Sequence, residues 1–128
     1  MSLQDENSTA VIDTASRQVI AKIPVGPGPI QVLAAPNGRE VYVANQGTQV
    51  APGNTVSVID TASQKVVAEI VTKAGAHGFV VSGSGDRVFI ANIFADTVSV
   101  IDPASRQVVR SILVGVGPGG ITYAAGKD

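Results

Sequence analysis

The chain offers few side chains that could do chemistry. The chain contains one histidine, His77, and no cysteine. A metal site needs about three or more such ligands, and no nucleophile, base and acid stand together in a recognisable pattern. The sequence therefore predicts no metal, no cofactor and no catalytic residue. His77 itself has two interpretations, a ligand-facing group or a solvated turn residue.

Asn45 and Asn92 end two matching phrases, Tyr-Val-Ala-Asn and Phe-Ile-Ala-Asn, which lie 92 − 45 = 47 residues apart. A carboxamide in this position could contact a ligand, or it could hold the neighbouring hairpin by bonding backbone groups. Recurrence of the residue in each repeat favours the structural role. Both asparagines nevertheless remain candidates for ligand binding.

Three aspartates occupy a second recurring phrase. Asp13 and Asp60 lie in Val-Ile-Asp-Thr-Ala-Ser, and Asp102 lies in Val-Ile-Asp-Pro-Ala-Ser. Aspartate at the first position of a turn accepts hydrogen bonds from backbone N–H groups, so we predict that these residues form structural turns. Gly38 and Gly85 favour hairpins in which a positive φ is needed.

The aspartate phrases recur after 60 − 13 = 47 and 102 − 60 = 42 residues. Self-similarity at this period, in segments that read as strands, is typical of β-propeller blades. The unit in the middle of the chain contains four such segments, separated by turn residues and rich in Val and Ile. The sequence therefore predicts an all-β chain of four-stranded antiparallel sheets. The predicted strands of the middle unit are about 31–35, 40–44, 55–59 and 65–71.

The repeats begin and end out of phase with the chain, so we expect an incomplete propeller in one segment, 1–128. Residues 1–6 could retain a stub of a second strand, and a lone first strand is predicted at about 120–124. The predicted divisions are a partial blade at 8–30, complete blades at 31–73 and 78–114, and the first strand of a further blade at 118–128.

Composition excludes several classes of protein. The formal net charge is −1, with nine basic and ten acidic residues, so a nucleic-acid partner is not expected. No apolar run approaches the roughly 20 residues that cross a bilayer. The polar N-terminus does not resemble a secretory signal, which is consistent with a cytosolic protein or with a leader removed earlier.

The 47-residue spacing between the first two aspartate phrases and the 42-residue spacing between the last two differ by five residues. Comparison of the repeats places an insertion of five residues within 46–53, in the middle unit. Because exceptional loops on a regular scaffold often carry specificity, Gln46 and Gln49 are candidates for ligand binding, and so is Phe94, which follows Asn92. A tolerated surface insertion is the alternative. The run Gly-Val-Gly-Pro-Gly-Gly at 115–120 spells a dinucleotide motif, but the helix that this motif requires does not follow it.

The recurring phrases that contain the asparagines and the aspartates resemble the YVTN-type β-propeller repeat of surface-layer and YncE-like proteins. The resemblance extends from about residue 8 to about residue 125 and rests on the Tyr-Val-x-Asn and Ile-Asp phrases and on Val-Gly segments followed by proline. It implies that His77 faces the mouth of the central channel, and it favours a periplasmic or extracellular location. Since propellers typically have four to eight blades, we expect a fragment of about three repeats or a piece that oligomerises.

The predicted function is a non-catalytic repeat module that acts as a scaffold or binding platform. Its expected partners are another protein or a second copy, bound through exposed blade faces. One alternative is a fragment of a propeller enzyme or cofactor-binding protein, haem d1-like or lactonase-like. Another is an oligomeric lectin-like propeller, whose sites usually need stacking aromatics; aromatic residues make up 4% of the chain.

Overall fold

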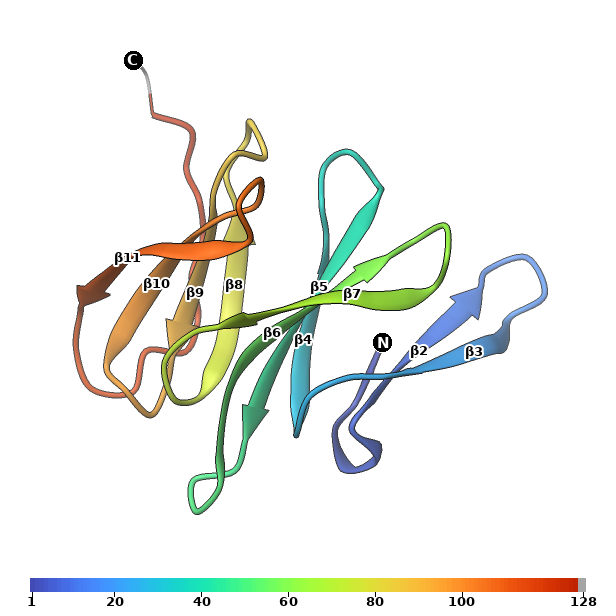
Figure 1. The fold of residues 1–128 in the computed structure, drawn as a ribbon, viewed down its shortest axis with the longest axis horizontal. Helices are drawn as coiled ribbons and strands as arrows, with labels where there is room; N and C mark the ends of the chain where they lie inside the picture. The colour runs from blue at the N-terminus through green and yellow to red at the C-terminus, as the bar shows by residue number, and fades with distance from the viewer. Residues whose placement is uncertain (127–128) are drawn as a thin grey trace.

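The structure, a computed structural model, describes residues 1–126 and arranges them as three antiparallel sheets that fan out side by side (Figure 1). The first sheet contains β1 (Ser2–Leu3), β2 (Ser8–Asp13) and β3 (Gln18–Pro24), with a short 3-10 turn, η1 (Gln4–Glu6), after β1. The second contains β4 (Pro29–Ala34), β5 (Glu40–Gly47), β6 (Pro52–Asp60) and β7 (Lys65–Val71). The third contains β8 (Ala76–Val81), β9 (Val88–Asn92), β10 (Thr97–Asp102) and β11 (Gln107–Leu113).

Each four-stranded sheet is a meander in which consecutive strands pair, as in a propeller blade. The predicted all-β fold of blade-like sheets is confirmed. No helix within residues 1–126 is long and apolar enough to cross a membrane.

Alternation of side chains along the strands builds the core between the sheets. In β6, Val56 and Val58 pack with the third sheet, whereas Ile59 packs with the first. Side chains of successive strand residues point to opposite faces, so one Val/Ile-rich strand supplies both interfaces. Tyr42 and Phe79 fill the interface between the second and third sheets.

The first sheet begins earlier than the predicted 8–30 division. β1 pairs with β2 in the register Ser2↔Thr9 and Leu3↔Ser8, which matches Ala44↔Val56 and Asn45↔Thr55 in the second sheet. The predicted stub is therefore the last two residues of a second strand.

In the described part of the predicted first strand of a further blade, residues 118–126 form no strand. A strand is defined by hydrogen bonds to a neighbour, and within residues 1–126 no strand pairs with this segment. It still packs against the third sheet, where the rings of Tyr123 and Phe89 stack with centroids 6.5 Å apart. Residues 127–128 lie outside the described residues.

Candidate functional site

The three Ile-Asp turns lie at one end of the sheets, and the sheet-to-sheet connections lie at the other (Figure 1). Asp13 and Asp60 accept the backbone N–H of Ser16 and Ser63 at 2.8 and 2.7 Å. Asp102 accepts the backbone N–H of Ala104 at 3.2 Å. Hydrogen bonds from the turn serine hydroxyls, followed by these backbone hydrogen bonds, hold the pKa of each aspartate below its ordinary value of 3.8.

The glycines of the other turns at this end also have a structural role. Gly38 and Gly85 have φ of 68° and 78°, a region that glycine enters without the steric penalty of a Cβ. The three aspartates and two glycines predicted to form turns therefore lie at the end of the sheets opposite the sheet-to-sheet connections. They stabilise the hairpin turns.

Asn45 and Asn92 are fully buried at equivalent strand ends. Asn45 Nδ2 donates to Thr55 Oγ1 and Ser57 Oγ at 2.9 and 2.8 Å. Asn92 Nδ2 donates to Thr97 Oγ1 and Ser99 Oγ at 3.1 and 2.9 Å, and its Oδ1 accepts Lys73 N–H at 3.4 Å. Each carboxamide therefore ties its strand to the next strand of the sheet.

His77 and Gln46 come together at the connecting end. His77 Nδ1–H donates to Gln46 Oε1 across 2.5 Å, and both side chains are half-buried. This bond leaves Nε2 as the acceptor nitrogen of the neutral ring. Gly119 of the C-terminal segment lies beside the same imidazole, so the pair sits where β8, the end of β5 and this segment meet.

The other predicted ligand-binding residues at this end form no side-chain hydrogen bond with His77 or Gln46 in the described part of the chain. The insertion forms an extended hairpin in which Gly47 pairs with Pro52, and Gln49 is exposed at its tip. Phe94 is half-buried against Gly75, where a Cβ would approach the ring to 2.6 Å. The hairpin projects beyond the connections in Figure 1.

Two polar links between sheets were not predicted from the sequence. Gln31 Oε1 accepts Phe79 N–H at 3.1 Å, which joins the first strands of the second and third sheets. Arg106 donates to Glu40 at 2.9 Å, and Glu40 in turn accepts the hydroxyl of Tyr42 at 3.0 Å. Burial of Tyr42, with the neighbouring Glu40 charge, raises its pKa to about 12.

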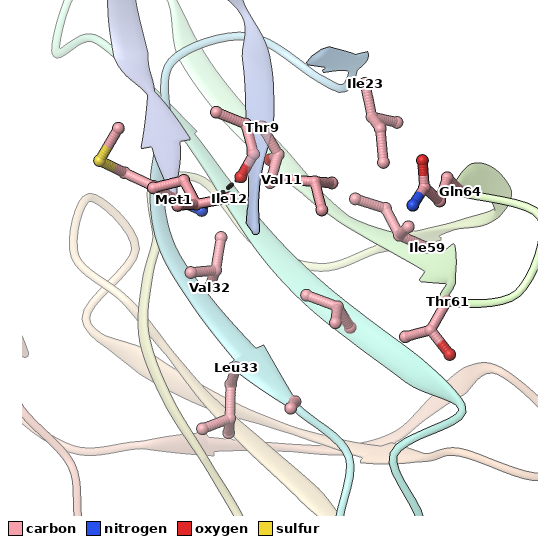
Figure 2. A pocket seen from close by; sticks show the side chains of 13 residues that line it. Met1, Thr9, Val11, Ile12, Ile23, Val32, Leu33, Ile59, Thr61 and Gln64 are labelled. Carbon is pink, nitrogen blue, oxygen red and sulfur yellow. Dashed lines mark hydrogen bonds between the residues drawn. The ribbon is translucent and has the colours of Figure 1, made fainter. Parts of the chain in front are cut away.

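A cavity of about 340 Å³ lies between the first and second sheets (Figure 2). Its walls are mainly aliphatic, with Val11 and Ile23 from the first sheet and Val32, Val41 and Ile59 from the second. Thr9 also lines it, and so do Thr61 and Gln64, which are both exposed. Sequence reasoning missed this cavity, although the threonine is a departure from the repeat: Val56 and Val98 occupy the equivalent position of the other sheets.

Among residues 1–126, no group of three or more His, Asp or Glu side chains is placed to hold a metal ion. The polar groups of the connecting end, an imidazole and several carboxamides, can donate and accept hydrogen bonds. They are suited to recognising a polar group.

Comparison with known proteins identifies the repeat. A family model described as a YNCE-like beta-propeller matches residues 32–125. No sequence among the curated proteins matches the chain.

Two solved structures share the fold. Hydrazine synthase from Kuenenia stuttgartiensis superimposes with a TM-score of 0.81 at 24% identity over 91% of this chain and 33% of that one. Dihydro-heme d1 dehydrogenase NirN in complex with DHE superimposes with a TM-score of 0.73 at 22% identity over 89% of this chain and 24% of that one. The chain thus spans a third or less of the length of either structure, and at these identities the likeness concerns the fold alone.

Proposed function

Because the chain belongs to the YNCE-like β-propeller family, we propose that it is a non-catalytic repeat module that binds other proteins, including its own copies, through the outer faces of its first and third sheets. The observation that carries the proposal is the exposure of apolar positions that are buried elsewhere in the same repeat.

Equivalent residues of the sheets differ sharply in exposure. Ile59 of the second sheet is 4% exposed, whereas its equivalent Ile12 on the outer face of the first sheet is 45% exposed. Ile70 is 2% exposed, whereas its equivalent Ile112 on the outer face of the third sheet is 39% exposed. The outer faces therefore repeat the chemistry of the inner interfaces, and a face of this kind is stabilised when another blade covers it.

The non-catalytic part of the proposal is supported by what the polar side chains do. Asn45, Asn92 and the turn aspartates bond groups within their own sheets, and Gln31 bonds the neighbouring sheet. Their hydrogen-bonding capacity is used mainly to hold the fold.

Light scattering on the purified chain tests the proposal. We expect association at tens of micromolar, which Ile112→Asp should abolish, because the new carboxylate would be buried unpaired in the interface. Val50→Asp is the control, since Val50 is 95% exposed at the tip of the β5–β6 hairpin. A monodisperse wild-type monomer would contradict self-association, and equal association of the Ile112→Asp variant would move the contact to another face.

The cofactor-binding alternative has one observation in its favour, the half-buried His77 beside Gln46 at the connecting end. Haemin titration followed by absorbance distinguishes it from a scaffold. A saturable spectral change that His77→Ala removes and Gln49→Ala retains would support a cofactor protein, whereas no saturable change supports the scaffold.

A further inference from the structure

We propose that Asn37 is a site of covalent self-modification in the folded protein. Its side-chain amide cyclises onto the backbone nitrogen of Gly38 and releases ammonia, and water then opens the ring to leave an aspartyl or isoaspartyl residue. The two residues form the exposed tip of the hairpin between β4 and β5. Three observations support this site: the neighbouring glycine, a backbone donor on the Asn37 side chain, and a hairpin of the third sheet that is built without asparagine.

The nucleophile is the backbone nitrogen of Gly38. Glycine has no Cβ to obstruct the approach of this nitrogen to the Asn37 side chain, and a Cβ built at Gly38 would meet no atom within 4 Å among residues 1–126. An attack within one chain also needs no encounter of separate molecules, which favours it over direct hydrolysis. The other four of the five asparagines precede bulkier residues: Asn7 precedes Ser, Asn45 precedes Gln, Asn54 precedes Thr and Asn92 precedes Ile.

The turn prepares the carboxamide for attack. The Arg39 backbone N–H donates to Asn37 Oδ1 at 2.9 Å. Negative charge develops on this oxygen when the nitrogen attacks Cγ, and a donor already directed at the oxygen stabilises that charge. The Gly38 N–H itself donates to the Ala35 carbonyl at 2.9 Å, so the turn must open before the attack, and an exposed hairpin tip opens at low cost.

The reaction balances with water as its only co-reactant. Base removes the Gly38 amide proton, the N–Cγ bond forms, and the Cγ–Nδ2 bond breaks as the nitrogen leaves with a proton from water as ammonia. Water then opens the succinimide. Opening at Cγ yields an aspartyl residue, and opening at the backbone carbonyl leaves the main chain running through the side chain as an isoaspartyl residue. No atom is oxidised or reduced.

The third sheet shows that this hairpin does not require asparagine. Ser84 occupies the position equivalent to Asn37. The Gly85 N–H donates to the Ser82 carbonyl at 2.9 Å, as the Gly38 N–H does in the second sheet. Asn37→Ser should therefore fold normally, and it supplies a matched variant that cannot cyclise.

Conversion should loosen the contact between two neighbouring turns. Thr61 Oγ1 donates to the Gly38 carbonyl at 2.9 Å, and the Thr61 N–H donates to the Arg39 carbonyl at 3.0 Å. An isoaspartyl residue adds a methylene group to the main chain just before these carbonyls. The two hydrogen bonds cannot then both keep their geometry.

The test is incubation of the full chain at mildly alkaline pH, followed by tryptic peptide mass spectrometry and an ammonia assay. Asn37 is the only asparagine of peptide 23–39, whereas peptide 40–65 contains Asn45 and Asn54 and is the internal control. We expect peptide 23–39 to give two products of equal mass, modified at residue 37. Their rate of formation should rise roughly tenfold for each pH unit, because the fraction of deprotonated amide does so. Ammonia should appear in the same amount, and Asn37→Ser should leave this peptide unmodified.

A sample unfolded in urea verifies that the products can be detected. Conversion in urea but not in the folded chain would overturn the proposal, and so would conversion in neither sample or equal conversion of peptide 40–65. The incubated wild type should melt at a lower temperature than fresh protein, whereas incubated and fresh Asn37→Ser should melt alike. An unchanged melting temperature after conversion would refute the loosening of the Thr61 contact.

Discussion

Asp60 illustrates how single residues close the blades. Its carboxylate accepts the Ser63 N–H at 2.7 Å, while Gln64 enters the left-handed region with φ of 54°. Asp13 with Arg17 repeats this arrangement. The turn phrase recurs because the same local hydrogen bond is needed wherever the third strand meets the fourth.

Replacing Asp60 by alanine should lower the melting temperature at pH 7, because the turn loses its acceptor. The folded pKa is lowered, chiefly by the hydrogen bonds from Ser63, so this stabilisation is present above pH 3.8 and is lost as the pH falls through the folded pKa. Calorimetry should therefore show a difference between Asp60→Ala and wild type that shrinks in acid. Asp5→Ala, at an exposed residue of η1, should match the wild type, and so would Asp60→Ala if the carboxylate were merely solvated.

Tyr42 should titrate far above an ordinary tyrosine. Its pKa is raised from 10.0 to about 12, first by burial and then by Glu40. Because the folded state holds the proton more tightly, the associated stability is intact below pH 10 and is lost as the pH rises from 10 to 12. Ultraviolet absorbance in a Tyr123→Phe background isolates this group. Glu40→Gln should move the midpoint down, and an unchanged midpoint would leave burial as the whole cause.

At the scale of elements, each buried asparagine joins neighbouring strands of a sheet. Asn92 bonds Thr97 and Ser99 of β10 and accepts Lys73 N–H from the connection between the second and third sheets. In the first sheet the equivalent residue is Leu3, and Ser8, the equivalent of Thr97, is buried with an unpartnered hydroxyl. The carboxamide therefore gives the hydroxyl groups at that strand end a hydrogen-bond donor, although Asn45 Oδ1 itself has no partner within residues 1–126.

Asn92→Ala should lower the free energy of unfolding by about 1–3 kcal/mol, because it leaves buried partners such as Ser99 without their hydrogen bond. Urea denaturation followed by circular dichroism measures the change. The matched control is Asn54→Ala, at an exposed residue, which should stay within about 0.5 kcal/mol of the wild type. Equal effects of the two substitutions would show that the Asn92 bonds contribute little.

At the scale of the whole molecule, the sheets stack one on the next and leave an uncovered face at each side (Figure 1). The area of such a face matters because apolar burial contributes roughly 25 cal/mol per Å². Covering several hundred Å² would therefore add several kcal/mol, which is comparable to the stability of a small domain.

Association through these faces should make the melting temperature rise with protein concentration, since a complex of folded chains favours folding by mass action. Scanning calorimetry over a tenfold or wider concentration range measures this effect. Ile112→Asp should melt at a temperature that does not depend on concentration. A constant melting temperature for the wild type would indicate that the outer faces stay uncovered in solution.

The sequence by itself determined the strands, turns and blade-like sheets. This information is local: alternation of apolar residues specifies a face, and phrases such as Ile-Asp-Thr-Ala-Ser specify a turn within a few residues. The placement of Asn45 and Asn92 at strand ends followed from the same repeats. The match of residues 32–125 to a propeller family agrees with that interpretation.

Only the tertiary structure decided what meets across distance. Pairing of His77 with Gln46, 77 − 46 = 31 residues away, depends on how two sheets are set side by side. The segment at 120–124 has strand-like residues, but no strand pairs with it within residues 1–126, and pairing of this kind depends on a neighbour as well as on the local pattern. The cavity beside Thr9 depends on the volumes of side chains brought together from two sheets, and no local pattern encodes such a sum.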